Sequence, residues 1–211
     1  MAANRIAVVG AGIAGRGIAC ASIVGGFETI IEDIRSNVLA QATDGIRRLL
    51  DAGVAEGAIS AVDAARALQR LRTAGRVEEV GDTDLIIEAG PEEMELKTEL
   101  FGMLDKFARA GTILASSSPS LPITEMAEVT QRPERCIGMR FADAAGETGL
   151  LVLVRTPATS RETLEICSEV GRRMRRRIVT IDESPAGKSN REEKTVESRR
   201  AASQFRQESG R

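Results

Sequence analysis

The sequence predicts an α/β fold of the Rossmann type: a doubly wound, mostly parallel sheet with an inserted helical pair. Three observations predict it. An apolar, β-rich run at Arg5–Val9 leads directly into a glycine-rich turn at residues 10–15. A helix-like stretch and a second β-rich run follow, and an acid, Asp33, ends that run. Short β-rich runs then alternate with longer amphipathic stretches, which is typical of βαβ units.

The glycine turn has the spacing of a dinucleotide-binding motif, with glycines at Gly10, Gly12 and Gly15. Gly10 permits a tight turn out of the strand, Gly12 lets the backbone approach a pyrophosphate, and Gly15 lets the helix pack close to the strand. The free amides and the dipole at the start of the helix favour phosphate. Such a turn is weak evidence alone, but strand, helix and acid are all in register here.

The acid after the second strand indicates which dinucleotide binds. Asp33 lies eighteen residues after Gly15 and can accept hydrogen bonds from both ribose hydroxyls. A carboxylate at this place would repel a 2′-phosphate. The sequence therefore favours NAD over NADP.

A helical pair is expected between the second strand and the next, as an arm at about residues 36–73. Ser36 can cap its first helix, which runs to about Leu50, where two glycines interrupt it. Ser60 opens a near capping box, so we expect a second helix from there through about Leu71. The other expected strands are residues 28–32, 85–87, 112–115, 136–141, 150–154 and 178–181, and the other expected helices are residues 16–24, 93–109, a short one after Pro122, and 163–174.

Composition and charge narrow the class of protein. Apolar residues make up 42% of the 211 residues, enough for a core, and a net charge of -2 gives no case for nucleic acid as a partner. The chain has no apolar run of membrane-spanning length and no basic-then-apolar leader, so we expect a cytoplasmic protein without a membrane partner. Three isolated cysteines suggest neither a metal site nor a disulfide framework. The sequence has no histidine, which removes the commonest general base and metal ligand.

The end of the chain differs in character from the rest. Residues 187–211 are polar and mixed in charge, and Val196 and Phe205 are their only sizeable apolar side chains. We therefore expect a nucleotide-binding domain at residues 1–186 and a polar tail that cannot form a second domain. An arginine-rich run at residues 172–177 fits either cations at a helix C-terminus or an anion site.

Several stretches together resemble the NAD-binding domain of the L-3-hydroxyacyl-CoA dehydrogenases, which interconvert 3-hydroxyacyl-CoA and 3-ketoacyl-CoA. The resemblance covers about residues 4–191. The stretches that carry it are residues 9–19, 87–101, 114–121, 132–138, 184–185 and 190–191. It implies NAD as the cofactor, a helical arm that contacts CoA, and an acyl-CoA or another small anionic substrate.

The resemblance also implies a set of cofactor-binding residues. Asp33 would hold the adenosine ribose. Ala89, Glu92 and Lys97 would line the nicotinamide half, although taken alone the last two read as a helix-start acid and a surface lysine. Ser117 stands where the family usually has an asparagine. The full set of expected cofactor residues is Gly10, Gly12, Ile13, Gly15, Asp33, Ala89, Glu92, Lys97 and Ser117.

The catalytic positions of the family are mostly substituted. Arg140 stands where the family has its histidine general base, Val152 where it has the orienting glutamate, and Pro119 where it has a serine. Only Asn190 matches. Arginine stays protonated at working pH and cannot be that base, and valine cannot orient an imidazole. Arg140 could clamp a carboxylate or phosphate, or pair with Asp143.

Three hypotheses for function follow. The first is an NAD-binding member of this family with impaired dehydrogenase activity. The second is a working oxidoreductase on a different anionic substrate that Arg140 anchors. The third is a non-catalytic module that senses NAD(H) or binds a partner. The apolar residues that lead into the family's second domain are absent at residues 186–189, so any homo-oligomer would use an interface unlike the family's.

Overall fold

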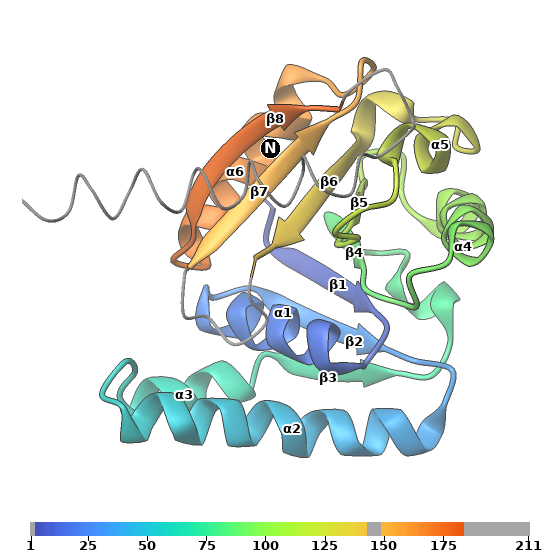
Figure 1. Ribbon diagram of the computed structural model, residues 1–211. Coiled ribbons are helices and arrows are strands. Elements are labelled where there is room, and N and C mark those ends of the chain that lie inside the picture. Colours follow the sequence, from blue (N-terminus) through green and yellow to red (C-terminus); the bar gives the residue numbers. More distant parts are fainter. Residues whose placement is uncertain (1–2, 143–148, 184–211) are drawn as a thin grey trace, which may run out of the picture.

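The computed structural model describes residues 3–142 and 149–183 of the chain. Its strands form one eight-stranded sheet in the order β3-β2-β1-β4-β5-β6-β7-β8 (Figure 1). Every neighbouring pair is parallel except β6 and β7, which are antiparallel. The strands are β1 (Arg5–Val9), β2 (Glu28–Glu32), β3 (Leu71–Ala74), β4 (Leu85–Glu88), β5 (Ile113–Ser116), β6 (Cys136–Phe141), β7 (Leu150–Arg155) and β8 (Arg177–Asp182). The predicted mostly parallel α/β fold is confirmed.

Helices cover both faces of this sheet. They are α1 (Ile13–Val24), α2 (Ser36–Ala55), α3 (Ala61–Leu68), α4 (Met94–Phe107), α5 (Ile123–Glu128) and α6 (Arg161–Arg173), with 3₁₀ turns η1 (Val77–Val80) and η2 (Pro133–Arg135). The helices α1 and α6 share a core with one face of the sheet, and α4 and α5 share a core with the other. This double covering explains why most strands read as continuous apolar runs.

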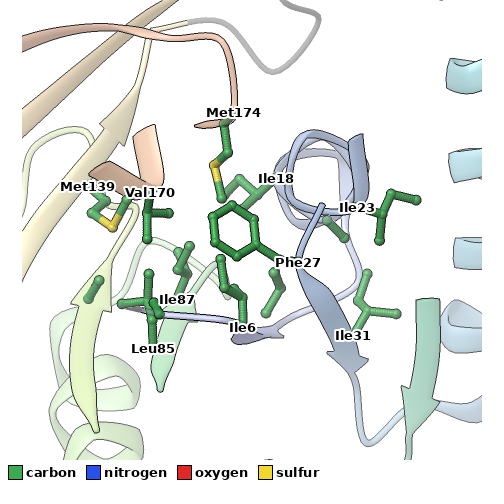
Figure 2. Packing of buried hydrophobic residues seen from close by; sticks show 14 of the residues in the cluster. Ile6, Ile18, Ile23, Phe27, Ile31, Leu85, Ile87, Met139, Val170 and Met174 are labelled. Carbon is green, nitrogen blue, oxygen red and sulfur yellow. The ribbon is translucent and has the colours of Figure 1, made fainter. Parts of the chain in front are cut away.

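The larger core lies between the sheet, α1 and α6 (Figure 2). Phe27 at its centre is fully buried, and Ile6, Ile18 and Met174 lie around its ring. The guanidinium of Arg173 lies 3.8 Å from the centroid of the same ring. The core therefore joins the start of the chain to its last described helix.

Most element boundaries agree with the sequence prediction. The strands at residues 5–9, 28–32 and 136–141 are confirmed residue for residue. Ser60 caps α3, since its hydroxyl accepts from the Asp63 amide, and Ser160 caps α6 in the same way through Thr163. Both serines thus satisfy a free amide in the first turn of their helix.

The predicted helical arm needs correction. The first helix does not stop near Leu50 but continues to Ala55, because Leu50 and Val54 still pack on the core and this outweighs Gly53. Ser36 is not a cap, since Arg35 holds the cap position without a side-chain bond. The second helix ends at Leu68, and the next residues form β3, parallel to β2. As a short edge strand, β3 shows no apolar alternation.

The arginine-rich run at residues 172–177 contacts neighbouring segments. Arg172 pairs with Glu169 at 2.6 Å. The Arg173 guanidinium donates to the Ala3 carbonyl oxygen at 3.0 Å, and that of Arg175 donates to the Ala58 carbonyl oxygen at 3.1 Å. The Arg172 pair lies within α6, whereas Arg173 and Arg175 join the end of this helix to the N-terminus and to the helical arm.

No helix in the described part of the chain is both long enough and apolar enough to cross a bilayer.

The glycine turn generates the first prediction. A Cβ on Gly15 would lie 1.8 Å from the Gly10 carbonyl oxygen, whereas a Cβ on Gly12 would meet nothing within 4 Å. We therefore expect Gly15→Ala to lower the free energy of unfolding by about 1–3 kcal/mol or more, because α1 must move away from β1. Gly12→Ala is the matched control with little change. Chemical denaturation measures both, and equal stability of the two variants would contradict the expectation.

Candidate functional site

The candidate site lies at the carboxyl ends of the parallel strands, where β1 is flanked by β2 and β4. The chain runs from β1 outward to β2 and β3 and then returns to β4 on the other side. Open α/β sheets bind their ligands where the strand order reverses in this way. The loops after β1, β2, β4 and β5 carry most of the predicted cofactor residues.

The turn after β1 brings three strand ends together. The Gly10 amide donates to the Glu32 carbonyl oxygen at 2.8 Å, and the Ala11 amide donates to Asp33 Oδ2 at 3.0 Å. Gly10 has φ +106°, and a Cβ there would lie 2.7 Å from the Ala89 carbonyl oxygen. The structure therefore places Gly10, Asp33 and Ala89 in contact around the start of α1.

Two apolar side chains beside this turn point into solvent. Ile13, the first residue of α1, is 77% exposed, and Ile34, next to Asp33, is 82% exposed. Both follow neighbouring strands, β1 and β2, at the same end of the sheet. Ile13 was expected here and Ile34 was missed, although a large apolar residue directly after the ribose acid is a signal in the sequence. Together they offer apolar surface to a bound base.

Asp33 is surrounded by donors. It is 5% exposed, and besides the Ala11 amide it accepts from the amide, Nε and Nη2 of Arg35. Burial opposes ionisation, but the hydrogen bonds from Arg35 and Ala11 outweigh it and hold the pKa of Asp33 below its ordinary value. The carboxyl is therefore an anion at neutral pH. Sequence analysis did not single out Arg35.

Glu32, the last residue of β2, is a second buried acid. Its side chain is 2% exposed and its Oε1 has no hydrogen-bond partner. Burial, and then the negative charges of Asp33, Glu79 and Glu78, raises the pKa of Glu32 to about 7. The ionised form is thus disfavoured in the folded protein.

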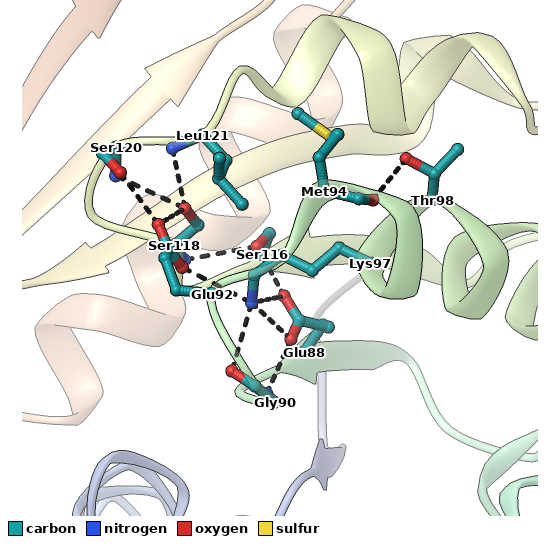
Figure 3. A network of polar contacts seen from close by, with 10 residues as sticks. All are labelled: Glu88, Gly90, Glu92, Met94, Lys97, Thr98, Ser116, Ser118, Ser120 and Leu121. Carbon is teal, nitrogen blue, oxygen red and sulfur yellow. Dashed lines mark hydrogen bonds and ion pairs between the residues drawn. The ribbon is translucent and has the colours of Figure 1, made fainter.

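Lys97 is not the surface lysine that one interpretation of the sequence proposed. It is 2% exposed, and its ammonium donates to Glu88 Oε1 and Oε2 at 2.7 and 2.8 Å and to the Gly90 carbonyl oxygen at 3.3 Å (Figure 3). Ser116 donates to the same carboxylate at 2.6 Å. Because these contacts use all three ammonium protons, Lys97 holds the loop after β4 and is no free base.

Glu92 connects the loops after β4 and β5. Its Oε1 accepts from Ser118 Oγ at 2.5 Å and from Ser120 Oγ at 3.0 Å, and its Oε2 lies 3.7 Å from Lys97 Nζ (Figure 3). Ser117 sits between these groups, with its amide donating to the Glu88 carbonyl oxygen. The structure brings the predicted Glu92, Lys97 and Ser117 together, and Glu88 is the residue that sequence reasoning missed.

Arg140 and Val152 face each other across the antiparallel pair β6–β7, as Cα partners in the ladder. Arg140 Nε and Nη2 are buried without a hydrogen-bond partner among residues 3–142 and 149–183. Burial lowers the pKa of Arg140 from its ordinary value, while the carboxylates of Glu183 and Glu92 oppose that shift. Asp143 and Asn190 lie outside the described residues. Pro119 is exposed at the tip of the loop after β5.

Glu183, directly after β8, anchors this end of the sheet. Its carboxylate accepts from the amides of Ile123 and Thr124 at 2.6 and 2.8 Å. These are the first two residues of α5, so the carboxylate caps that helix from 60 residues away. Sequence reasoning missed Glu183.

The cysteines offer no nucleophile. Burial raises the pKa of Cys20 and Cys136 to about 11 and that of Cys167 to about 12, so the thiols stay protonated. In the part of the chain that the structure describes, no three acids or cysteines gather as ligands of a metal ion.

The sequence matches one family model over residues 5–184, that of the 3-hydroxyacyl-CoA dehydrogenase NAD-binding domain. The chain belongs to the 3-hydroxyacyl-CoA dehydrogenase family. Its cofactor is therefore NAD. The resemblance inferred from the sequence motifs is confirmed.

Relatives and solved structures agree with this assignment. The probable 3-hydroxybutyryl-CoA dehydrogenase of Bacillus subtilis is 34% identical over 90% of this chain and 67% of the relative. The mitochondrial hydroxyacyl-coenzyme A dehydrogenase of Sus scrofa is 32% identical over 89% and 62%. The structure of (S)-3-hydroxybutyryl-CoA dehydrogenase PaaH1 from Ralstonia eutropha superposes with a TM-score of 0.84 at 29% identity, covering 90% of this chain and 67% of that one. The chain thus spans at most about two thirds of these dehydrogenases.

Within the family fold, the two halves of the site differ. The turn after β1, Asp33 and the Glu88–Lys97 pair form a closely bonded cofactor side. The side at Arg140 and Val152 carries an unpaired guanidinium edge beside an apolar side chain. Each half therefore holds a buried polar group without a partner among the described residues, Glu32 Oε1 in the first and the Arg140 guanidinium edge in the second.

The buried pair of Glu88 and Lys97 generates the second prediction. Lys97→Met leaves the Glu88 carboxylate buried without its cation, which typically costs about 3–5 kcal/mol of folding free energy. Urea denaturation at neutral pH measures this loss. Lys106→Met, in the exposed last turn of the same helix, is the matched control. A similar loss of stability in both variants would show that Lys97 does not hold the loop after β4.

Glu32 generates the third prediction. Because its folded pKa is raised to about 7, ionisation destabilises the fold, and this loss accumulates from about pH 4.5 to pH 7. Glu32→Gln removes the ionisation. We expect the stability of the variant relative to the wild type to rise by on the order of 2 kcal/mol between pH 5 and pH 8. Glu28→Gln, at the exposed start of the same strand, is the control; a pH-independent difference for Glu32→Gln would refute the assignment.

Proposed function

We propose that this chain binds NAD(H) as its family does, and that its 3-hydroxyacyl-CoA dehydrogenase activity is impaired. The observation that carries the second part is the juxtaposition of Arg140 and Val152 in the β6–β7 ladder. By resemblance these are the positions of the general base and of the acid that orients it. Their register supports a family geometry that is retained while the chemistry of both side chains is changed.

The proposed loss follows from proton transfer. When bound, NAD supplies hydride exchange with a substrate alcohol, but the alcohol proton also needs an acceptor with a pKa near working pH. Arg140 remains a cation even though burial lowers its pKa. Val152 carries no polar atom, and the whole chain has no histidine. Acid/base catalysis typically contributes about 10²–10⁴ in rate, so its loss leaves little turnover.

The neighbouring polar residues do not replace the missing base. The Lys97 ammonium donates hydrogen bonds to the Glu88 carboxylate and to the Gly90 carbonyl oxygen. Glu92 Oε1 already accepts hydrogen bonds from the hydroxyls of Ser118 and Ser120. Both residues support the shape of the cofactor side rather than proton transfer.

A second candidate function has one specific observation in its favour. Nε and Nη2 of Arg140 form the edge of a guanidinium that binds carboxylates bidentately, and both atoms are buried without a partner. Buried N–H groups without an acceptor are costly, so an anionic group of a substrate that reaches this edge would be bound strongly. This supports an oxidoreductase acting on a small anion other than a 3-hydroxyacyl-CoA.

The fourth prediction separates cofactor binding from chemistry. We expect NADH to bind to the purified chain with a rise in nicotinamide fluorescence, and Asp33→Ala to weaken binding about tenfold or more, because it removes the ribose acceptor. The chain contains neither Trp nor Tyr, so its own emission does not interfere.

With acetoacetyl-CoA added, we expect NADH oxidation at least about 10²-fold slower than with the Bacillus subtilis relative assayed in parallel. Arg140→His combined with Val152→Glu should raise that rate more than Arg140→His alone, since the glutamate would orient the imidazole. Rapid oxidation by the wild-type chain would disprove impairment. Absence of NADH binding would disprove the cofactor assignment.

A further inference from the structure

We infer that Arg35 sets the dinucleotide specificity of the ribose subsite: its guanidinium competes with ribose hydroxyls for Asp33 and provides a cation for a 2′-phosphate. The inference rests on the proposed function, because it assumes that the turn after β1 binds a dinucleotide. It modifies the expectation from sequence that Asp33 favours NAD over NADP.

The acceptor capacity of Asp33 is the first step. A carboxylate has about four lone-pair positions. Oδ2 accepts from the Ala11 amide and from Arg35 Nη2, both at 3.0 Å. Oδ1 accepts from the Arg35 amide at 3.0 Å and from Arg35 Nε at 2.9 Å. All four positions therefore have donors before any ribose is bound.

The four donors are not equally fixed. The two amides belong to the backbone of the turn after β1 and of the start of α2. The guanidinium belongs to a side chain that is 58% exposed, while the Asp33 carboxyl is 5% exposed. Arg35 can therefore swing into solvent, whereas Asp33 cannot follow it. Ribose hydroxyls can donate to the Asp33 carboxylate only by displacing Nε and Nη2 of Arg35.

The consequence differs for the two dinucleotides. For NAD, the ribose must replace two charge-assisted hydrogen bonds with neutral hydroxyl donors, which reduces the gain from Asp33. For NADP, the 2′-phosphate is repelled by Asp33 but lies beside the guanidinium, which offsets the repulsion with bidentate bonds. Arg35 therefore reduces the preference for NAD over NADP that Asp33 alone would give.

The test measures dissociation constants of NADH and NADPH by nicotinamide fluorescence for the wild-type chain and for Arg35→Ala. Arg48→Ala is the matched control, since Arg48 is an exposed arginine of the same helix and its loss changes net charge equally. We expect the ratio of the NADPH constant to the NADH constant to rise about tenfold or more in Arg35→Ala. NADH binding itself should tighten or stay unchanged. In Arg48→Ala the ratio should stay within about twofold of the wild type.

Each outcome is decisive. The inference is overturned if the ratio of the two dissociation constants is unchanged in Arg35→Ala. This holds also where both constants change by the same factor, because such a change reports only a structural role for Arg35. Failure of the wild-type chain to bind NADPH while it binds NADH overturns it as well. If neither dinucleotide binds to any variant, the proposed function fails and the inference fails with it.

Discussion

Close backbone approach at Gly10 is the constraint on which the cofactor half of this protein depends. Residues without side chains let β1, α1 and the loop after β4 meet: a Cβ on Gly10 or Gly15 would lie 2.7 or 1.8 Å from a carbonyl oxygen. This contact fixes the start of α1, and the Ala11 amide then reaches Asp33. The buried ion pair between Glu88 and Lys97 holds the loop after β4 in place. The backbone positions of Gly10, Ala11 and the loop after β4 are thus set by packing.

Much of this arrangement could be predicted because it depends on local signals. Glycine spacing, apolar strands and Ser-led caps are written in neighbouring residues, and they gave the sheet and the position of Gly10, Gly12 and Asp33. What failed depended on partners distant in sequence. The strand β3 has no apolar pattern because it lies at an edge, and only its backbone pairs with β2. From the sequence alone Lys97 looks like a surface residue, and only the fold shows that its ammonium is buried against the Glu88 carboxylate.

The substrate side shows a different relation between sequence and structure. The motif positions of Arg140 and Val152 follow from resemblance, and their direct opposition follows from the β6–β7 register. The lack of partners for Nε and Nη2 of Arg140 among the described residues could not be predicted, because it depends on which hydrogen-bond acceptors the fold places out of reach. The pairing of β6 with β7 thus keeps these two residues opposite each other whatever their side chains are. Stability of the strands does not require those side chains to react.

The contact of α6 with the N-terminus has a consequence for synthesis. Arg173 donates to Ala3, 170 residues earlier, and Met174 completes the apolar surroundings of Phe27. During translation β1, α1 and β2 leave the ribosome long before α6 exists, so their shared apolar surface stays uncovered on one side. At about 5–20 residues per second this interval lasts on the order of ten seconds or more. Until α6 is made, the apolar surface around Phe27 therefore lacks the cover that Val170 and Met174 give it in the folded chain.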